Sequence, residues 1–334
     1  MTAQLVTGAR FPSVEPKAGH YESFYLKACH PSAPLGVWIR YTIHKAPGGR
    51  PHGSLWFVLF DATADEPLAS KVTLDPDETG NGPDHYVHIG DSRFEPGRVV
   101  GRAPSEQLDA AWDLTFESSE PPFHHLPRAW MYRAPIPKTK LLSPHPAALF
   151  SGTVTAGDRS VELDGWPGMV GHNWGAQHAE RWIWMHGTGF EGRYGSTWFD
   201  AAIGRIKVGP LTTPWIGNAV LCLNGRRHRL GGPERARSTD VSERPDGCDF
   251  TLPGKDLSVR GTVGSERRNF VGWIYADPDG PEHNTVNCSI ADMTLTVVRP
   301  GAEDLTLAVS GGATYELGMR ERDHGMKIQP FPDG

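Results

Sequence analysis

The amino-acid sequence predicts an all-β protein built from many short antiparallel strands in two similar halves. Gly contributes 39 and Pro 29 of the 334 residues, and they interrupt nearly every segment before a long helix could form. Many of the segments between them alternate between apolar and polar residues, which is typical of strands with one buried face. Landmarks of the first half also return, in the same order, in the second half.

The alternating segments predict individual strands. The period of two is found in residues 37–43, 112–116 and 257–263. Residues 55–60 are wholly apolar, so we expect a strand that is covered on both faces. The stretches rich in Gly and Pro are expected to form hairpin loops at 44–53, 75–84, 118–127 and 231–247. One helix is expected near 104–111, with Ser105 as its cap.

An internal repeat predicts two domains. The matching segments are Gly-Ser-Leu-Trp-Phe at 53–57 and Gly-Ser-Thr-Trp-Phe at 195–199, the Trp-Ile pairs at 38–39 and 182–183, and the segments 113–116 and 292–295. The last pair is more widely spaced than the others, which implies an insertion in the second half. We therefore expect an N-terminal domain over residues 1–178, ordered from about residue 20, and a C-terminal domain over residues 179–334.

The charge balance argues against a nucleic-acid partner. The net charge is −6 and the pI is near 6.2, whereas phosphate binding needs a basic surface. The densest basic cluster, residues 226–229 (Arg-Arg-His-Arg), follows Asn224-Gly225 and is expected to be a solvated hairpin tip.

Targeting and cysteine patterns predict a cytoplasmic protein. The start of the chain lacks a basic stretch followed by an apolar one, so we expect no secretory signal. No apolar run approaches the roughly 20 residues that a membrane helix requires, so we expect no integral membrane segment. The four cysteines are scattered and form no Cys-x-x-Cys pair, so we expect reduced thiols.

Residues 172–186 are the densest unusual stretch of the chain. They contain three His, three Trp, one Glu and one Arg. If residues 181–186 form a strand, Trp182, Trp184 and His186 share one face, while Arg181, Ile183 and Met185 share the other.

The segment Gly171-His172-Asn173-Trp174-Gly175, followed by Trp-Ile-Trp at 182–184, resembles the signature of the carotenoid 1,2-hydratase (hydroxyneurosporene synthase) and AttH-like superfamily. Residues 287–289 and 315–318 also fit, so the resemblance extends from about Tyr21 to Gly334. It implies two lipocalin-like (calycin) antiparallel β-barrel domains in tandem. Relatives include tocopherol cyclases and fungal Diels–Alder cyclases, so the resemblance does not select one reaction.

The resemblance implies two catalytic candidates, His172 and Asp200. Hydratases of this type use a His-x-Trp pair, matched here by His172 and Trp174, and a later Tyr-x-Asp pair. Trp198 and Asp200 are the best match to the second pair, with Trp in place of Tyr, and an indole N–H is a much weaker acid than a phenol.

Protonating a carbon–carbon double bond needs a strong acid in a dry pocket. We expect burial to keep Asp200 protonated and His172 to orient it or to activate water. Indole faces stabilise a carbocation, so four tryptophans and one histidine are candidate substrate-binding residues: Trp174, Trp182, Trp184, Trp198 and His186. Each of these residues also has a purely structural interpretation.

We expect neither a metal nor another cofactor. The spacing of His172, His178 and His186 suits no compact zinc motif, and the pair His124-His125 is expected to lie on a surface loop. The sequence contains no nucleophile elbow, P-loop or dinucleotide fingerprint. It leaves the roles of His178, Glu180 and Arg181 open.

Three functions follow from these observations. The first is a cofactor-independent enzyme that hydrates, cyclises or isomerises an apolar isoprenoid- or polyketide-like molecule in a Trp-lined pocket. The second is a non-catalytic carrier of a small hydrophobic molecule, and the third is an interaction protein with solidly packed barrels. The sequence determines neither the substrate nor the oligomeric state.

Overall fold

The computed structural model describes residues 8–193 and 195–330, and strands form most of its regular structure. The all-β prediction is therefore confirmed. The helical segments of the described ranges are six 3-10 turns: η1 (Phe11–Ser13), η2 (Pro76–Glu78), η3 (Ala129–Tyr132), η4 (Phe190–Gly192), η5 (Pro233–Ser238) and η6 (Arg267–Asn269). None of the helices that the structure describes has the length and apolar character needed to cross a bilayer.

The first sheet contains the first twelve strands of the chain. They are β1 (His20–Cys29), β2 (Leu35–Lys45), β3 (His52–Asp61), β4 (Leu68–Leu74), β5 (Thr79–Gly80), β6 (Val87–Ile89), β7 (Ser92–Glu95), β8 (Arg98–Pro104), β9 (Asp109–Glu117), β10 (Phe123–His124), β11 (Thr139–Ala156) and β12 (Arg159–Gly175). The sheet curls until β4 approaches β8, where Ser70 Oγ donates a hydrogen bond to the Ala103 carbonyl at 2.7 Å. It is thus a nearly closed antiparallel barrel.

The second sheet contains ten strands. They are β13 (Arg181–Thr188), β14 (Trp198–Arg205), β17 (Ile216–Leu223), β18 (Arg226–Gly231), β19 (Asp240–Arg244), β20 (Gly247–Pro253), β21 (Ser258–Gly264), β22 (Val271–Ala276), β23 (Glu282–Val298) and β24 (Leu305–Met319). A separate hairpin is formed by β15 (Lys207–Val208) and β16 (Leu211–Thr212). An isolated bridge between Leu230 and Gly254 joins the edge strand β18 to the end of β20.

The two sheets follow the same strand order. In the first sheet, β1, β2, β3 and β4 extend to one side, and β12, β11, β9 and β8 extend to the other. In the second sheet, β13, β14, β17 and β18 correspond to the first set, and β24, β23, β21 and β20 correspond to the second. The sequence landmarks do not mark equivalent strands, however. Residues 53–57 lie on β3, but residues 195–199 lead into β14, which corresponds to β2. Short Trp-containing motifs occur on any buried strand, so an alignment of the two halves by these motifs is shifted by one strand.

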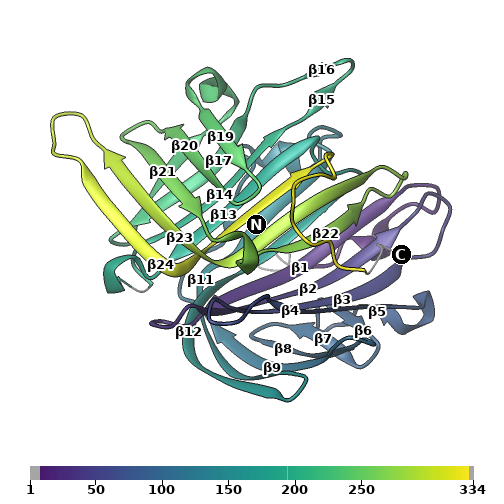
Figure 1. Ribbon diagram of the computed structural model, residues 1–334. Helices are drawn as coiled ribbons and strands as arrows, with labels where there is room; N and C mark the ends of the chain where they lie inside the picture. The colour runs from purple at the N-terminus through teal and green to yellow at the C-terminus, as the bar shows by residue number, and fades with distance from the viewer. Residues whose placement is uncertain (1–7, 194, 331–334) are drawn as a thin grey trace.

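Apolar side chains form one core inside the first sheet and a second core that reaches across the seam between the sheets. The first core includes Phe24, Ile39 and Phe57. The second combines the interior of the second sheet with outward-facing side chains of the first, such as Trp38 and Trp56. At the seam, Trp56 meets Trp273 edge to face at 5.0 Å. The strands of the two sheets lie one set above the other (Figure 1).

Most of the predicted strands agree with the structure, but several local predictions were wrong, and the predicted loops 75–84 and 118–127 contain the short elements η2, β5 and β10. Residues 104–111 form no helix, because β8 ends at Pro104 and β9 begins at Asp109, with the Ser105 hydroxyl closing the turn onto Leu108. Residues 231–247 contain η5 and β19 rather than one open loop. Residues 226–229 lie on β18 instead of at a hairpin tip. There, Arg227 pairs with Glu120 at 2.6 Å and so links β18 to the loop between β9 and β10.

Candidate functional site

A cavity of about 590 Å³ lies between the outer face of the first sheet and the second sheet. Its walls come from β1, β2, β11 and β12 on one side and from β13, β14, β17, β22 and β24 on the other. The segment between β10 and β11, residues 126–137, supplies further apolar side chains. Most lining residues are aromatic or aliphatic, so the cavity suits an apolar molecule.

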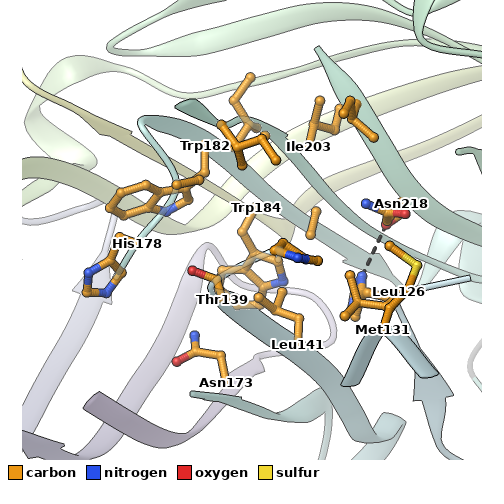
Figure 2. Close-up of a pocket in the computed structure, with 18 of the residues that line it drawn as sticks. Leu126, Met131, Thr139, Leu141, Asn173, His178, Trp182, Trp184, Ile203 and Asn218 are labelled. Atoms are coloured by element: carbon orange, nitrogen blue, oxygen red, sulfur yellow. Dashed lines mark hydrogen bonds between the residues drawn. The ribbon is translucent and has the colours of Figure 1, made fainter. Parts of the chain in front are cut away.

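Strand β13 forms one wall of the cavity with two of the predicted tryptophans. Trp182 and Trp184 both line it, and Met185 of the opposite face is buried in the core of the second sheet, although Ile183 of that face also reaches the cavity. Trp184 packs edge to face against Tyr25 of β1, with ring centroids 5.2 Å apart. Figure 2 shows both indoles, with His178 beside Trp182.

Two glycines make room for these rings. A Cβ atom at Gly318 would lie 2.2 Å from the Trp182 ring, and one at Gly171 would lie 2.1 Å from the Tyr25 ring. Both glycines fall in segments that carry the family resemblance. Their role is therefore to let aromatic side chains lie flat across neighbouring strands.

His178 and Asp277 form the most distinctive polar group of the cavity wall. His178 lies in the connection between β12 and β13 and lines the cavity, stacked on Tyr21 at 4.0 Å and on Trp182 at 5.3 Å. Asp277 Oδ1 accepts the backbone N–H of His178 at 2.7 Å and lies 2.8 Å from His178 Nδ1. His178 Nε2 has no hydrogen-bond partner among the described residues. This pairing fixes the imidazole with Nδ1 as donor to the carboxylate and leaves Nε2 for another group.

The Asp277 carboxyl is held in its ionised form. Burial acts to raise its pKa, but the hydrogen bonds and charge of His178 outweigh burial, and the pKa is lowered from its ordinary value. Asp277 is thus an anionic acceptor at neutral pH that would stabilise a protonated His178.

His283 completes a group that could hold a metal ion. One ligand atom each from His178, Asp277 and His283 lies within 4.8 Å of the others. Burial, followed by the charges of His178 and Arg320, lowers the pKa of His283 to about 3, so its imidazole is neutral. Two contacts argue against a bound cation. Asp277 Oδ1 is already hydrogen-bonded to His178, and the Arg320 guanidinium lies 3.9 Å from Asp277 Oδ2. We therefore interpret the group as a His–Asp pair with a neutral neighbour.

Glu316 is a second carboxylate of the cavity wall. Its two oxygens accept hydrogen bonds from Trp182 Nε1 at 3.0 Å, from the Tyr275 hydroxyl at 3.2 Å and from Asn287 Nδ2 at 3.2 Å. These donors fix both the carboxylate and the Trp182 indole.

Asp200 lies behind the cavity rather than on its surface. Its Oδ2 accepts a hydrogen bond from Ser143 Oγ at 2.5 Å and lies 3.4 Å from His125 Nε2, and His125 is the residue that lines the cavity. Burial acts to raise the Asp200 pKa, but the charge and hydrogen bond of His125 outweigh it, and the pKa is lowered. The expectation that burial keeps Asp200 protonated was therefore wrong. His125 is buried, which also corrects its prediction as loop surface.

His172 also lies outside the cavity. Side chains alternate along β12, so its neighbour Asn173 lines the cavity while His172 faces the interior of the first sheet. There, His172 Nε2 lies 2.7 Å from Glu22 Oε1, and the ring stacks on Phe24 at 4.2 Å. Trp174 lies beside it under the Arg10 guanidinium, 4.9 Å from the ring centroid.

Glu22 closes one end of the first sheet. Burial acts to raise its pKa, but hydrogen bonds from His172 and His20 prevail and lower the pKa to about 2. The backbone N–H groups of Arg10 and Phe11 also donate to Glu22. The arrangement is the anchor of the N-terminal segment, which explains the buried His172 structurally.

The remaining predicted site residues are parts of the core. Trp198 is fully buried in a small cluster with Phe123 and Val220, under the guanidinium of Arg227. His186 is buried farther along β13, and its Nε2 lies 2.8 Å from the Pro146 carbonyl. Of the seven predicted site residues, only Trp182 and Trp184 line the cavity.

Glu180 and Arg181, whose roles the sequence left open, form ion pairs within the second half. Glu180 lies 3.3 Å from Lys207 and 3.4 Å from Arg320. Arg181 pairs with Glu243 at 2.9 Å and with Glu321 at 2.7 Å. Neither charge lines the cavity.

Sequence reasoning missed Asp277, His283 and Glu316. The first two lie about a hundred residues beyond His178. The pairing of β22 with β23 places them beside each other, and the pairing of β13 with β24 and of β24 with β23 brings them to His178. Glu316 offered a signal, because it is the one charged residue in the strand segment 313–319. A carboxylate in such a position is buried and needs donors.

No family model matches the chain. An uncharacterized protein of Mycobacterium tuberculosis, matched in strains CDC 1551 / Oshkosh and ATCC 25618 / H37Rv, is 24% identical over 333 residues, covering 93% of this chain and 90% of that protein. Among solved structures, a protein of Nitrosomonas europaea assigned as AttH has a TM-score of 0.54 at 14% identity, over 94% of this chain and 98% of its own. Kievitone hydratase of Nectria haematococca has a TM-score of 0.54 at 10% identity, over 94% and 93%. These neighbours establish a shared AttH-like, lipocalin-type fold.

Proposed function

We propose that this protein is an enzyme that adds or removes water from, cyclises or isomerises a small apolar molecule in the cavity between its two sheets. The observation that carries this proposal is a mainly apolar cavity with a buried His–Asp pair in its wall. A carrier needs only the apolar surface, whereas an ionised carboxylate that fixes a histidine tautomer is typical of acid–base catalysis.

His178 is the proposed acid–base residue. Asp277 orients its imidazole and stabilises the protonated form, and Nε2 exchanges a proton with the substrate or with a water molecule that enters beside it. Tyr21 and Trp182 hold the ring between them, which limits its movement during the transfer.

Other cavity residues support the charge that develops during the reaction. Burial is the largest cause that raises the pKa of the Tyr25 phenol well above its ordinary value, and the nearby Asp200 and Glu316 carboxylates raise it further. Tyr25 therefore remains a hydrogen-bond donor. The indole faces of Trp182 and Trp184 would stabilise a cationic carbon.

The structural comparison supports the hydratase version of this proposal. Kievitone hydratase shares the fold, and its name states that it adds water. An isoprenoid- or polyketide-like substrate fits an aromatic-lined cavity of about 590 Å³. All four cysteines are buried and free, which supports a cytoplasmic location.

A substrate screen in oxygen-18-labelled water tests the proposal. Purified protein is incubated with isoprenoid alkenes and aromatic polyketides, and mass spectrometry records label incorporation and new isomers. We expect one class to be converted, and His178→Gln to lower kcat roughly 10²- to 10⁴-fold. The control is His228→Gln, which changes a histidine on β18 away from the cavity. Bound but unconverted ligand would favour the carrier, and full activity of His178→Gln would contradict the acid–base assignment.

A further inference from the structure

Most of the exposed large apolar side chains belong to two segments of the described chain. In the described part of the chain, the exposed large hydrophobic residues are Leu211 (72%), Trp130 (65%), Ile136 (53%), Val208 (50%) and Leu149 (41%). Four of these five belong to two segments, residues 126–140 around η3 and the β15–β16 hairpin. We call these two segments the rim.

Both segments of the rim adjoin the cavity. Trp130 and Ile136 line the cavity and are also mostly exposed, so the cavity reaches the surface there. The β15–β16 hairpin begins after Ile206 and ends before Ile216, and both of these residues line the cavity. Thr213 N–H donates to the Ile206 carbonyl at 3.0 Å and closes the base of the hairpin.

The exposed side chains of the first rim segment sit on an anchored backbone. The Tyr132 hydroxyl donates to the Leu141 carbonyl at 2.6 Å, and it accepts the Leu126 N–H at 3.2 Å. Lys140 Nζ donates to the Ala134 carbonyl at 2.8 Å. These bonds hold the segment from beneath, so the exposure of Trp130 and Ile136 is a fixed feature of its outer face.

The rim is basic although the whole chain is acidic. Residues 126–140 contain four basic side chains and no acidic one, while the chain carries a net charge of −6. Arg128, Arg133 and Lys138 are exposed in this segment. Lys207 of the hairpin contributes less because it pairs with Glu180.

We propose that the rim docks on the surface of an anionic lipid bilayer, with the cavity entrance facing the lipid. Exposed Trp and Leu side chains beside Lys and Arg are the combination that inserts into the headgroup region while pairing with anionic lipid. An apolar molecule could then pass between bilayer and cavity without crossing water. Docking concerns the outer surface and does not depend on whether the cavity performs the proposed reaction.

Vesicle flotation tests the proposal with the full-length protein. Vesicles of phosphatidylcholine alone are compared with vesicles that also contain phosphatidylglycerol. We expect binding to the anionic vesicles, weakened by salt, and roughly fivefold weaker binding for each of Arg133→Gln and Lys138→Gln. Arg93→Gln, at an exposed position of β7 in the first sheet, is the charge control and should bind as the unmodified protein does.

The apolar contribution is tested in the same assay. We expect Trp130→Ala with Leu211→Ala to lower binding at least tenfold, and Leu149→Ala, an exposed leucine of β11 that does not line the cavity, to leave it unchanged. Absence of binding to anionic vesicles would overturn the proposal. So would sedimentation showing a dimer that the Trp130→Ala, Leu211→Ala variant loses, because the rim would then be a contact between two copies.

Discussion

At the scale of single residues, the alternation of side chains between the two faces of a strand decides which polar groups meet in the cavity. His172 and Asn173 are adjacent in the sequence, yet Asn173 lines the cavity and His172 pairs with Glu22 inside the first sheet. The His178–Asp277 pair arises differently, from a connection between strands that crosses to a residue ninety-nine positions later. The reactive group of the proposed site therefore depends on tertiary contacts.

Asp277→Asn tests the orienting role of the carboxylate. We expect kcat to fall by roughly a hundredfold, because the amide neither fixes the His178 tautomer nor stabilises its charge. KM should change little, since Asp277 does not line the cavity. Steady-state kinetics with the substrate from the labelled-water screen give both parameters. The surface variant Asp256→Asn is the control. If Asp277→Asn instead raised KM and left kcat unchanged, the result would argue against an orienting role.

Chelation distinguishes a His–Asp pair from a metal centre. We expect prolonged dialysis against EDTA to leave turnover unchanged, because the Arg320 charge near Asp277 opposes a bound cation. Activity is measured before and after dialysis, together with metal content. Loss of activity that a divalent ion restores would instead assign His178, Asp277 and His283 as metal ligands.

Two buried neutral histidines make stability depend on pH. Burial is the main cause that lowers the pKa of His186 and of His283 to about 3, whereas an unfolded chain binds a proton near pH 6.5. The stabilising contribution is therefore complete above about pH 6.5 and decreases as the pH falls towards 3. We expect about 1.4 kcal/mol less stability per pH unit for each histidine below that value.

Urea unfolding at a series of pH values measures this dependence. His186→Gln should remove one histidine's share of the slope while keeping a donor for the Pro146 carbonyl. A slope that is the same in the variant would show that His186 is protonated in the folded protein.

At the residue scale, the sequence predicted the two tryptophans of the cavity wall but not the His178–Asp277 pair. Trp182 and Trp184 follow from the alternation along one strand, which is local information. His172 and Asp200 were selected by resemblance, and the structure places both behind other side chains. Which buried histidine lines a cavity depends on how two sheets meet, and no local pattern encodes that.

At the scale of elements, strand β13 links the two halves of the site. Its Trp182 is flanked by Gly204 of β14 and Gly318 of β24, which pair with it on either side. The strands themselves were predictable because a period of two needs only local residues. The 3-10 turns and short edge strands were not, since turn chemistry around Pro104 and Ser105 imitates a helix cap.

Gly318→Ala tests the fit of the Trp182 ring on β24. The added Cβ atom would lie 2.2 Å from the indole, so the ring must move into the cavity or rotate away from Glu316. We expect the affinity for the apolar ligand to fall roughly tenfold, or about 1.4 kcal/mol. Gly204→Ala adds a Cβ atom on the other side of Trp182 without such a clash, the nearest atom lying at 3.6 Å, but Gly204 also lines the cavity, so the unmodified protein is the reference for both variants. Calorimetric titration measures both, and equal affinities would mean that Trp182 does not contact the ligand.

At the scale of the whole molecule, the cavity lies where the first sheet meets the second sheet, which is drawn above it in Figure 1. We propose that the chain divides into domains at residues 1–178 and 179–334, since β12 ends the first sheet at Gly175 and β13 begins the second at Arg181. His178 then lies at the boundary, where a side chain can contact both sheets. Composition and alternation predicted the all-β class, whereas the division into two domains stays a prediction and nothing in the sequence indicated which faces would form the seam.

The central claim, that the ligand binds between the sheets, is tested most directly by a crystal structure with ligand bound. The apolar molecule that co-purifies with the protein, identified by mass spectrometry, is used for co-crystallisation. We expect its electron density against Trp182 and Trp184, within contact of His178. Density inside the first sheet, beside His172 and Glu22, would contradict the account.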